Sequence, residues 1–409
     1  MATESKHLST LSLPVIVAAL GYFVDIYDLI LFGIVRVASL KELGLEGEAL
    51  TEAGAYLLNM QMGGMLLGGI LWGVMGDKRG RLSVLFGSII LYSVANFLNG
   101  FVTSIEQYAL LRFMAGVGLA GELGAGVTLV AELLPPHQRG YGTMVIAGVG
   151  VTGAVAANLI ASVFDWRMAY MIGGGLGFGL LLLRVGLTES GMFASVRRGS
   201  VVRGNFFALF TKKELFSRYA KAIGIGIPLW YIVGILILFS PEFAKALGIV
   251  GEVKAGEAVM YCYIGLAIGD FASGYLSQKL RSRRKAVFAF LILSAVGVVG
   301  YLVALQGAPA WLFYAVSLYL GIAAGYWAVF ITVAAEQFGT NLRATVATTV
   351  PNFVRGMVIP ITSLFIMLKG AMGILGSAAV VGFISFLLAF LALARLEETY
   401  HKNLDYIEI

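Results

Sequence analysis

The chain has 409 residues, of which 59% are hydrophobic and 13% are charged, and its formal net charge is +6. Soluble domains carry about 45–50% apolar and about 25% charged residues. This composition excludes a soluble enzyme, a nucleic-acid-binding protein and a disordered chain. It indicates a membrane protein with several spans, in which Lys and Arg concentrate on the cytoplasmic side.

Residues that could bind a metal or a cofactor are sparse. The chain has one cysteine, Cys262, and its three histidines, His7, His137 and His401, lie far apart. A single cysteine forbids an intrachain disulfide. The glycine run that begins at Gly173 lacks the spacing of a dinucleotide-binding loop and follows no strand. We therefore expect no metal, no cofactor and no nucleic-acid partner.

Apolar stretches of about 20 residues predict membrane-spanning helices. In chain order they cover residues 12–35, 54–76, 82–103, 108–134, 141–164, 168–187, 222–241, 257–278, 286–306, 310–335, 344–368 and 373–394. The segment before the first stretch lacks the charged start and cleavage site of a signal peptide, so we expect the first helix to remain in the protein. The sequence thus predicts an all-α membrane protein with twelve transmembrane helices.

The distribution of Lys and Arg predicts the orientation. Twenty of the 29 basic residues lie in the two tails and in the loops on the same side, six lie in the opposite loops, and three lie within spans. By the positive-inside rule, both termini are expected in the cytoplasm. We expect the chain in the cytoplasmic (inner) membrane of a prokaryote.

The longest and most basic connection, residues 188–221, divides the twelve helices into two sets of six. We expect an N-terminal bundle over 1–187, a cytoplasmic linker, and a C-terminal bundle over 222–409. Such an arrangement is typical of duplicated transporters. Because one chain supplies both halves, it is expected to act as a monomer.

Two motifs recur between the halves. Glu132 is followed by Arg139 after seven residues, and Glu336 is followed by Arg343 at the same spacing, with an offset of 204 residues between the two pairs. The sequence GVMGDKRGR, from Gly73, follows the second span, and GYLSQKLRS follows the eighth span at an offset of 201 residues. The two offsets support a duplication.

In the loop that begins at Gly73, the residue types themselves indicate physical roles. Gly73 permits close helix approach, Gly80 permits a tight turn, and Asp77 and Arg81 offer a charge pair at the cytoplasmic rim. The loop resembles the signature loop of the major facilitator superfamily, whose two six-helix bundles move to give alternating access. The resemblance implies a set of gating residues. These are Gly73, Asp77, Gly80, Arg81, Glu132, Arg139, Glu336 and Arg343.

Further segments resemble the metabolite–proton symporter branch of that superfamily. They are DIYDLILFG (25–33), RFMAGVGLAGELGAG (112–126) and LTES after the sixth span. The chain also departs from the pattern, because Gln278 stands where the second signature loop would have Asp.

Charged residues lie inside the predicted spans. Asp25, Asp28, Glu122, Asp270 and Arg355 are all in apolar surroundings. A charge at the centre of a membrane costs about 2.5–3.5 kcal/mol on insertion scales, so the five together cost about 12–17 kcal/mol if they are ionised and unpaired. They are expected to face a wet cavity, to pair, or to be protonated.

Asp25 and Asp28 are three residues apart and share one helical face. Two nearby carboxylates repel each other, which favours protonation of one of them. Arg112 would oppose this, so its approach or withdrawal could switch proton affinity. The resemblance makes Asp28 the leading coupling residue, and we predict a proton-coupling set of Asp28, Asp25, Glu122 and Arg112. For Asp270 we leave open whether it takes part or only bonds neighbouring helices.

Arg355 has no counterpart in the first half, because the position 204 residues earlier is Val151. A buried Arg carries a fixed charge and binds a carboxylate or phosphate group in bidentate fashion. The alternative is a salt bridge to Asp270 or Glu336. Aromatic candidates on the first, seventh and tenth spans are Tyr22, Tyr27, Trp230, Tyr231, Tyr326 and Trp327. The predicted substrate-binding residues are Arg355, Asn352, Tyr27, Tyr231, Tyr326 and Gln61.

These features predict a proton-coupled symporter that imports a small organic metabolite, an anion such as a carboxylate. Its partners would be that substrate, protons and the lipid bilayer. A drug–proton exporter and a passive uniporter of the same fold remain alternatives, although the fifth span lacks the Pro of such exporters. A membrane-embedded enzyme or a sensor is a more distant alternative.

Overall fold

A computed structural model describes residues 13–122, 124, 126, 139–184, 206–402 and 408, and every described regular element is helical. The elements are α1 (Leu13–Glu42), α2 (Gly47–Arg79), α3 (Arg81–Asn99), α4 (Ile105–Leu119), α6 (Arg139–Val163), α7 (Trp166–Arg184), α9 (Ala208–Thr211), α10 (Lys213–Tyr231), the π-helix η1 (Ile232–Ile237), α11 (Ser240–Ala246), α12 (Ala255–Lys279), α13 (Arg283–Val299), the π-helix η2 (Gly300–Ala304), α14 (Ala310–Ala324), α15 (Trp327–Glu336), α16 (Thr340–Gly356) and α17 (Val358–Ala394).

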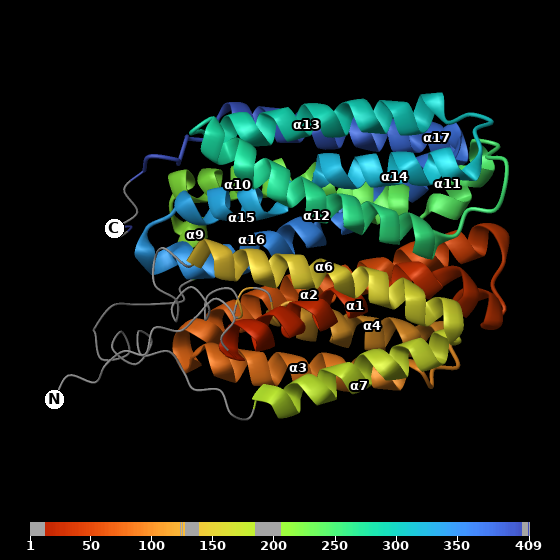
Figure 1. The fold of residues 1–409 in the computed structure, drawn as a ribbon, viewed down its shortest axis with the longest axis horizontal. Helices are drawn as coiled ribbons and strands as arrows, with labels where there is room; N and C mark the ends of the chain where they lie inside the picture. Colours follow the sequence, from red (N-terminus) through yellow and green to blue (C-terminus); the bar gives the residue numbers. More distant parts are fainter. Residues whose placement is uncertain are drawn as a thin grey trace.

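The helices form two layers that run side by side (Figure 1). Helices α1 to α7 make one layer, the N-terminal half, and α10 to α17 make the other, the C-terminal half. We call the end at which α1 begins and α17 ends the inner end, and the end at which α1 reaches Glu42 the outer end. The two halves meet along α1, α2 and α6 on one side and α12, α16 and α17 on the other.

Nine stretches among the described residues are long and apolar enough to cross a membrane. One of them, Thr345–Ala394, covers both the predicted eleventh and twelfth spans. Within α17, Gly373 has a φ of 68°, a conformation that favours glycine and turns the chain between these two spans. The predicted fifth span contains a shorter apolar helix, Gly148–Val163, and the last part of the fourth lies outside the described residues.

Two helix boundaries differ from the prediction. The predicted tenth span, 310–335, is broken into α14 and α15 at Gly325 and Tyr326, neither of which is in a regular helix. Helix α10 begins at Lys213, inside the stretch predicted as linker. Its first turns are amphipathic rather than apolar, which a search for hydrophobic runs overlooks.

Glycines set the contact between helices in each half. Gly64 and Gly68 of α2 lie directly on the backbone of α4, with no room for a side chain. At the offset of 201 residues, Gly265 and Gly269 of α12 lie in the same way on the backbone of α14. Small residues let membrane helices approach closely where lipid supplies no hydrophobic drive. The repeat seen in the loops therefore extends to the packing of the helices.

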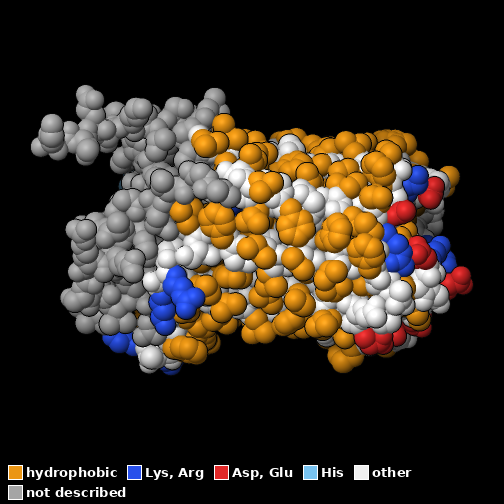
Figure 2. All heavy atoms as spheres, turned by 90° about the horizontal axis from the view of Figure 1, so that it is seen from below, with side chains coloured by type: hydrophobic (Ala, Val, Ile, Leu, Met, Phe, Trp, Pro, Cys, Tyr) orange, Lys and Arg blue, Asp and Glu red, His pale blue; other side chains and the backbone are white. Residues whose placement is uncertain are grey.

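The surface has the distribution that a bilayer requires. Hydrophobic side chains cover the middle of the face shown in Figure 2, and charged side chains gather toward its ends. Large apolar residues such as Leu182, Val163 and Tyr275 are at least 70% exposed. Soluble proteins rarely expose so wide an apolar surface, so this band is expected to face lipid.

Candidate substrate and proton site

The predicted coupling and binding residues are all buried, and the hydroxyls of Tyr231 and Tyr326 bind within the C-terminal half. Each is at most 3% exposed. They are Asp25, Asp28, Gln61, Tyr27, Arg112, Glu122, Tyr231, Tyr326, Asn352 and Arg355.

Arg355 lies on α16 between two tryptophan rings. The carbon of its guanidinium group is 5.6 Å from the ring centroid of Trp327 and 6.0 Å from that of Trp230. Its Nη1 donates to Oδ1 of Asn352 at 3.3 Å, while its Nε has no partner among the described residues. Asn352 in turn donates to the backbone oxygen of Ala120 at 3.0 Å, so it links the C-terminal half to α4 and orients the guanidinium group.

The two alternative ion-pair partners of Arg355 are engaged elsewhere. Asp270 accepts a hydrogen bond from the backbone N–H of Ala328 at 3.0 Å. Glu336 pairs with Arg283 at 3.4 Å and accepts from the hydroxyl of Thr399 at 2.6 Å. Asp25 of α1 lies within electrostatic range of Arg355 across the interface. Arg355 therefore holds a positive charge at the interface with part of its hydrogen-bonding capacity unused.

Asp25 and Asp28 face different surroundings although they share α1. Asp25 is influenced by Arg355 of the C-terminal half, whereas Asp28 is influenced by Arg112 and has Asn96 beside it in the N-terminal half. No carboxylate oxygen of either residue has a hydrogen-bond partner in the described part of the chain. The pair thus reaches from the interface into the N-terminal bundle.

Arg112 is held by α3 and α7. Its Nη2 donates to Oδ1 of Asn96, and its guanidinium carbon is 4.8 Å from the ring centroid of Tyr170. Its Nε and Nη1 find no partner among the residues described. Arg112 is therefore positioned to act on Asp28 without a direct ion pair to any described residue.

Glu122 lies near Asp25, on which it acts electrostatically, but it is paired within the N-terminal half. Arg184 Nη2 donates to its Oε2 at 2.7 Å, and Nη1 donates to its Oε1 at 2.8 Å. Ser88 adds a hydrogen bond from its hydroxyl at 3.1 Å, and both charged side chains are at most 2% exposed. This bidentate pair supplies the neutralisation that a buried carboxylate needs, and it supports a structural role for Glu122.

The three predicted binding tyrosines use their hydroxyls to join helices. Tyr27 donates to the backbone oxygen of Ala169 at 2.8 Å, Tyr231 to that of Ala378 at 2.7 Å, and Tyr326 to that of Ile225 at 2.9 Å. Gln61 donates to the backbone oxygen of Leu29 at 3.5 Å and leaves its own oxygen unpaired among the described residues. The ring faces, rather than the hydroxyls, are what these tyrosines can offer to a ligand.

The predicted gating residues are described in part. Gly73 lies where α2 approaches Thr348 and Thr349 of α16, and Gly80 has a φ of 102°, which favours glycine, between α2 and α3. Glu132 lies outside the described residues, as do the side chains of Asp77, Arg81, Arg139 and Arg343.

The outer end holds an ion pair between the halves that the sequence did not predict. Arg36 of α1 is 2.8 Å from Glu242 of α11 and also donates to the backbone oxygen of Leu238 at 3.2 Å. Its guanidinium carbon lies 4.4 Å from the ring centroid of Phe239. Arg36 is 1% exposed. These contacts close the outer end between α1 and α11.

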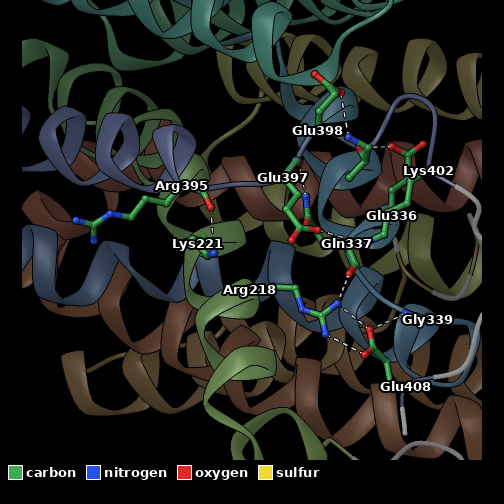
Figure 3. A network of polar contacts seen from close by, with 11 residues as sticks. Arg218, Lys221, Glu336, Gln337, Gly339, Arg395, Glu397, Glu398, Lys402 and Glu408 are labelled. Carbon is green, nitrogen blue, oxygen red and sulfur yellow. Dashed lines mark hydrogen bonds and ion pairs between the residues drawn. The ribbon is translucent and has the colours of Figure 1, made fainter.

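The inner end of the C-terminal half is tied together by the C-terminal residues (Figure 3). Arg218 of α10 binds both carboxylate oxygens of Glu408 at 2.9 Å and donates to the backbone oxygen of Gln337. Burial works to raise the pKa of Glu408, but the bonds from Arg218 and from the N–H of Gly339 outweigh it and hold that pKa below its usual value. The tail thereby connects α10 with the ends of α15 and α16.

Several functional candidates are absent from the predicted site residues. Trp230 and Trp327 are two of them, because the prediction names the neighbouring tyrosines instead. Asn96 sits one turn from Ser93 on α3, and Arg184 closes α7. A signal existed for Arg184, because an Arg inside a predicted span requires a buried partner.

Comparisons with known proteins agree with this architecture. Residues 16–355 match the family model described as Major Facilitator Superfamily. The chain is 24% identical over 371 residues to the gentisate transporter of Corynebacterium glutamicum, covering 84% of this chain and 79% of that one. It is 26% identical over 255 residues to the 4-hydroxybenzoate transporter PcaK of Pseudomonas putida, covering 55% of this chain and 56% of that one.

Among solved structures, the fold is similar to that of the proton:xylose symporter XylE, with a TM-score of 0.73 at 17% identity, covering 96% of this chain and 97% of that one. This likeness concerns the fold. Together with the match over most of the chain, it supports the two-bundle arrangement of the helices. The chain belongs to the Major Facilitator Superfamily and is a membrane transporter, not an enzyme.

Proposed function

We propose that the chain imports a small organic acid together with protons. The observation that carries this proposal is Arg355, a fixed charge placed between the rings of Trp230 and Trp327 with its Nε unpaired among the described residues. A guanidinium fork binds a carboxylate in bidentate fashion, and flanking aromatic rings favour a flat apolar body. This combination suits an aromatic or other planar carboxylate.

The relatives support the same substrate class. Two of them are named as transporters of gentisate and 4-hydroxybenzoate, and others are named for benzoate and niacin. Each of these compounds carries a carboxylate on a planar ring. We propose this class of substrate for the chain, and not any one compound.

Asp28, Asp25 and Arg112 form the proposed coupling group. Protonation of Asp28 would remove its attraction to Arg112, and protonation of Asp25 would remove its attraction to Arg355. A ligand carboxylate at Arg355 would compete with ionised Asp25 for the same charge, which favours protonation of Asp25. Substrate binding and proton binding would thus support each other, as reciprocal linkage requires.

The proposal includes the setting in which transport occurs. We place the chain in the cytoplasmic membrane with both termini in the cytoplasm, as the Lys and Arg distribution favours, and as a monomer. The outer end would then face the cell exterior. The halves would rock about the central site to open it to either side.

The test uses proteoliposomes that contain the full chain and a pH-sensitive dye. They are challenged with benzoate, gentisate, 4-hydroxybenzoate and niacin, and with xylose and a cationic drug as contrasts. We expect acidification of the lumen with one or more of the acids, and a half-saturating concentration at least about tenfold higher in Arg355→Lys, which loses the fork. Because a weak acid also crosses lipid unaided, empty liposomes set the baseline. Alkalinisation with the drug, or acid uptake without proton movement, would overturn the proposal.

A further inference from the structure

Polar side chains gather inside the N-terminal half, away from the interface where Arg355 lies. Asp28 of α1, Ser93, Asn96 and Asn99 of α3, and Arg112 of α4 are each 0% exposed. Each has at least one side-chain nitrogen or oxygen atom without a hydrogen-bond partner among the described residues. We call this group the polar chamber.

Glycines of α7 leave the space in which these groups lie. A side chain at Gly173 would overlap Oδ1 of Asp28, and a side chain at Gly177 would overlap the hydroxyl of Ser93. Gly173 and Gly177 are one turn apart on one face of α7. The carboxylate of Asp28 and the hydroxyl of Ser93 therefore lie along the same bare strip of helix backbone.

Hydrogen bonds and ring contacts continue from the chamber toward the outer end. Arg112 donates to Asn96 and lies over the ring of Tyr170. The hydroxyls of Tyr170 and Tyr108 are 2.7 Å apart, and Tyr108 also donates to the hydroxyl of Ser39 at 3.4 Å. Ser39 lies three residues before Glu42, the last residue of α1, whose side chain is 51% exposed.

Buried polar atoms in native proteins are satisfied either by protein groups or by ordered water. A site holds water when it is polar, has room for the molecule and offers it two to four partners. The carboxylate of Asp28, the amides of Asn96 and Asn99, and the free nitrogens of Arg112 provide such partners. Chains of hydroxyls and waters are also the routes along which protons move between carboxylates.

We infer that the polar chamber binds a string of water molecules that delivers protons from the outer end to Asp28, separately from the path of the substrate. The inference rests on the proposed function, because it assumes that Asp28 receives the coupled proton. All of its residues belong to the N-terminal half, whereas the substrate site draws on α10, α15 and α16 of the other half. Asp28 is the point at which the proton route approaches the interface, since Asp25 lies three residues away on α1.

The first test needs no substrate. Hydroxyl radicals generated by X-ray pulses in solution modify aromatic side chains that lie next to bound water, and mass spectrometry locates the modified residues. We expect Tyr108 and Tyr170 to be modified several-fold faster than Tyr301. This control tyrosine is equally buried, but its hydroxyl donates to the backbone oxygen of Leu236 in the C-terminal half. Equally slow modification of all three would overturn the inference.

The second test changes the chamber. Asn99→Leu and Ser93→Val replace unpaired polar groups by apolar ones, and Ser294→Val is the matched control. Ser294 is also a fully buried serine whose hydroxyl lacks a partner in the described chain, but it lies on α13. We expect the two chamber variants to slow modification of Tyr170 and to reduce proton-driven uptake of the acid found active above, while leaving exchange of that acid across the membrane unchanged. The control should alter neither readout.

The two proposals fail in different ways. If the tyrosines are modified rapidly but no acid moves protons, the chamber stands and the proposed function fails. If acids move protons but the chamber is dry, or both chamber variants keep full proton-driven uptake, the proposed function stands and the separate proton route is wrong.

Discussion

At the scale of single residues, the buried charges of this transporter fall into two groups. Glu122 and Arg184 neutralise each other through two short hydrogen bonds. Among the described residues, the carboxylates of Asp25 and Asp28 have no hydrogen-bond partner, and Arg112 and Arg355 donate to Asn96 and Asn352 rather than to a carboxylate. Unpaired charge in a membrane is expensive and is typical of functional positions. The sequence places all six charges within predicted spans, but it does not show which are paired, because pairing depends on contacts between distant helices.

Breaking the Glu122–Arg184 pair tests its structural role. Glu122→Gln should destabilise the protein by about 3–5 kcal/mol, since it leaves Arg184 buried without a counter-charge. Replacing both residues together, as Glu122→Leu with Arg184→Met, should restore much of that stability and retain proton-driven uptake. Unfolding in detergent and uptake by proteoliposomes measure the two effects. A double variant that is stable but has lost proton-driven uptake would show that Glu122 belongs to the coupling group.

At the scale of elements, the sequence predicted the number and order of the helices better than their interruptions. Hydrophobic runs and basic loops gave the twelve spans, because the bilayer imposes their length. The break between α14 and α15 was not predicted, since its cause is tertiary. Gly325 lies directly on Gly269 of α12, and Asp270 accepts from the first turn of α15. Asp270, whose role the sequence left open, thus caps a half-helix that carries Trp327 at its start.

The hydrogen bond from the backbone N–H of Ala328 to Asp270 can be removed by a single substitution. Asp270→Ala should lower the free energy of unfolding by about 0.5–2 kcal/mol, the usual value of an N-terminal cap. Asp270→Asn keeps an acceptor oxygen and should lose less. Thermal unfolding compares the two. Equal stability of the Ala variant and the unmodified chain would show that the hydrogen bond to Ala328 does not stabilise α15.

The contacts that Glu408 makes at the inner end should depend on pH. The pKa of Glu408 is held below its ordinary value of 4.5 in the folded chain. The contribution of Glu408 to the free energy of unfolding is therefore complete above pH 4.5 and is lost as the pH falls through the lowered pKa. We expect carboxypeptidase resistance of the tail at pH 7 and its loss in Glu408→Gln, while Glu397→Gln, whose partner Lys402 is 3.6 Å away at the surface, should change little. Equal resistance of both variants would contradict this role.

At the scale of the whole molecule, the two halves are joined at the outer end by Arg36 and Glu242. This contact crosses between halves whose internal packing repeats at an offset of about 200 residues. The repeat could be predicted from the loops, but the ion pair could not, because neither residue belongs to a repeated motif. Alternating access requires such a contact to break when the outer end opens.

The outer ion pair should bias the equilibrium between states. Glu242→Gln leaves Arg36 without its counter-charge, so we expect spin labels on α2 at Glu52 and on α17 at Gly370, both exposed, to move apart in pulsed electron spin measurements. The buried Cys262 should not take up label. Lys369→Gln serves as the control, because its pair with Glu48 also joins the two halves at this end but is exposed and should contribute little. An unchanged distance in Glu242→Gln would show that this pair does not hold the outer end closed.

The central claim is that Asp28 couples proton entry to substrate entry. Its most direct test is to compare uphill uptake with exchange in proteoliposomes that contain Asp28→Asn, using the acid that acidifies the lumen of the unmodified protein. The account predicts that uptake against a gradient is lost, because Asn cannot carry the proton, while exchange of labelled acid continues. Full uphill uptake by Asp28→Asn would contradict it.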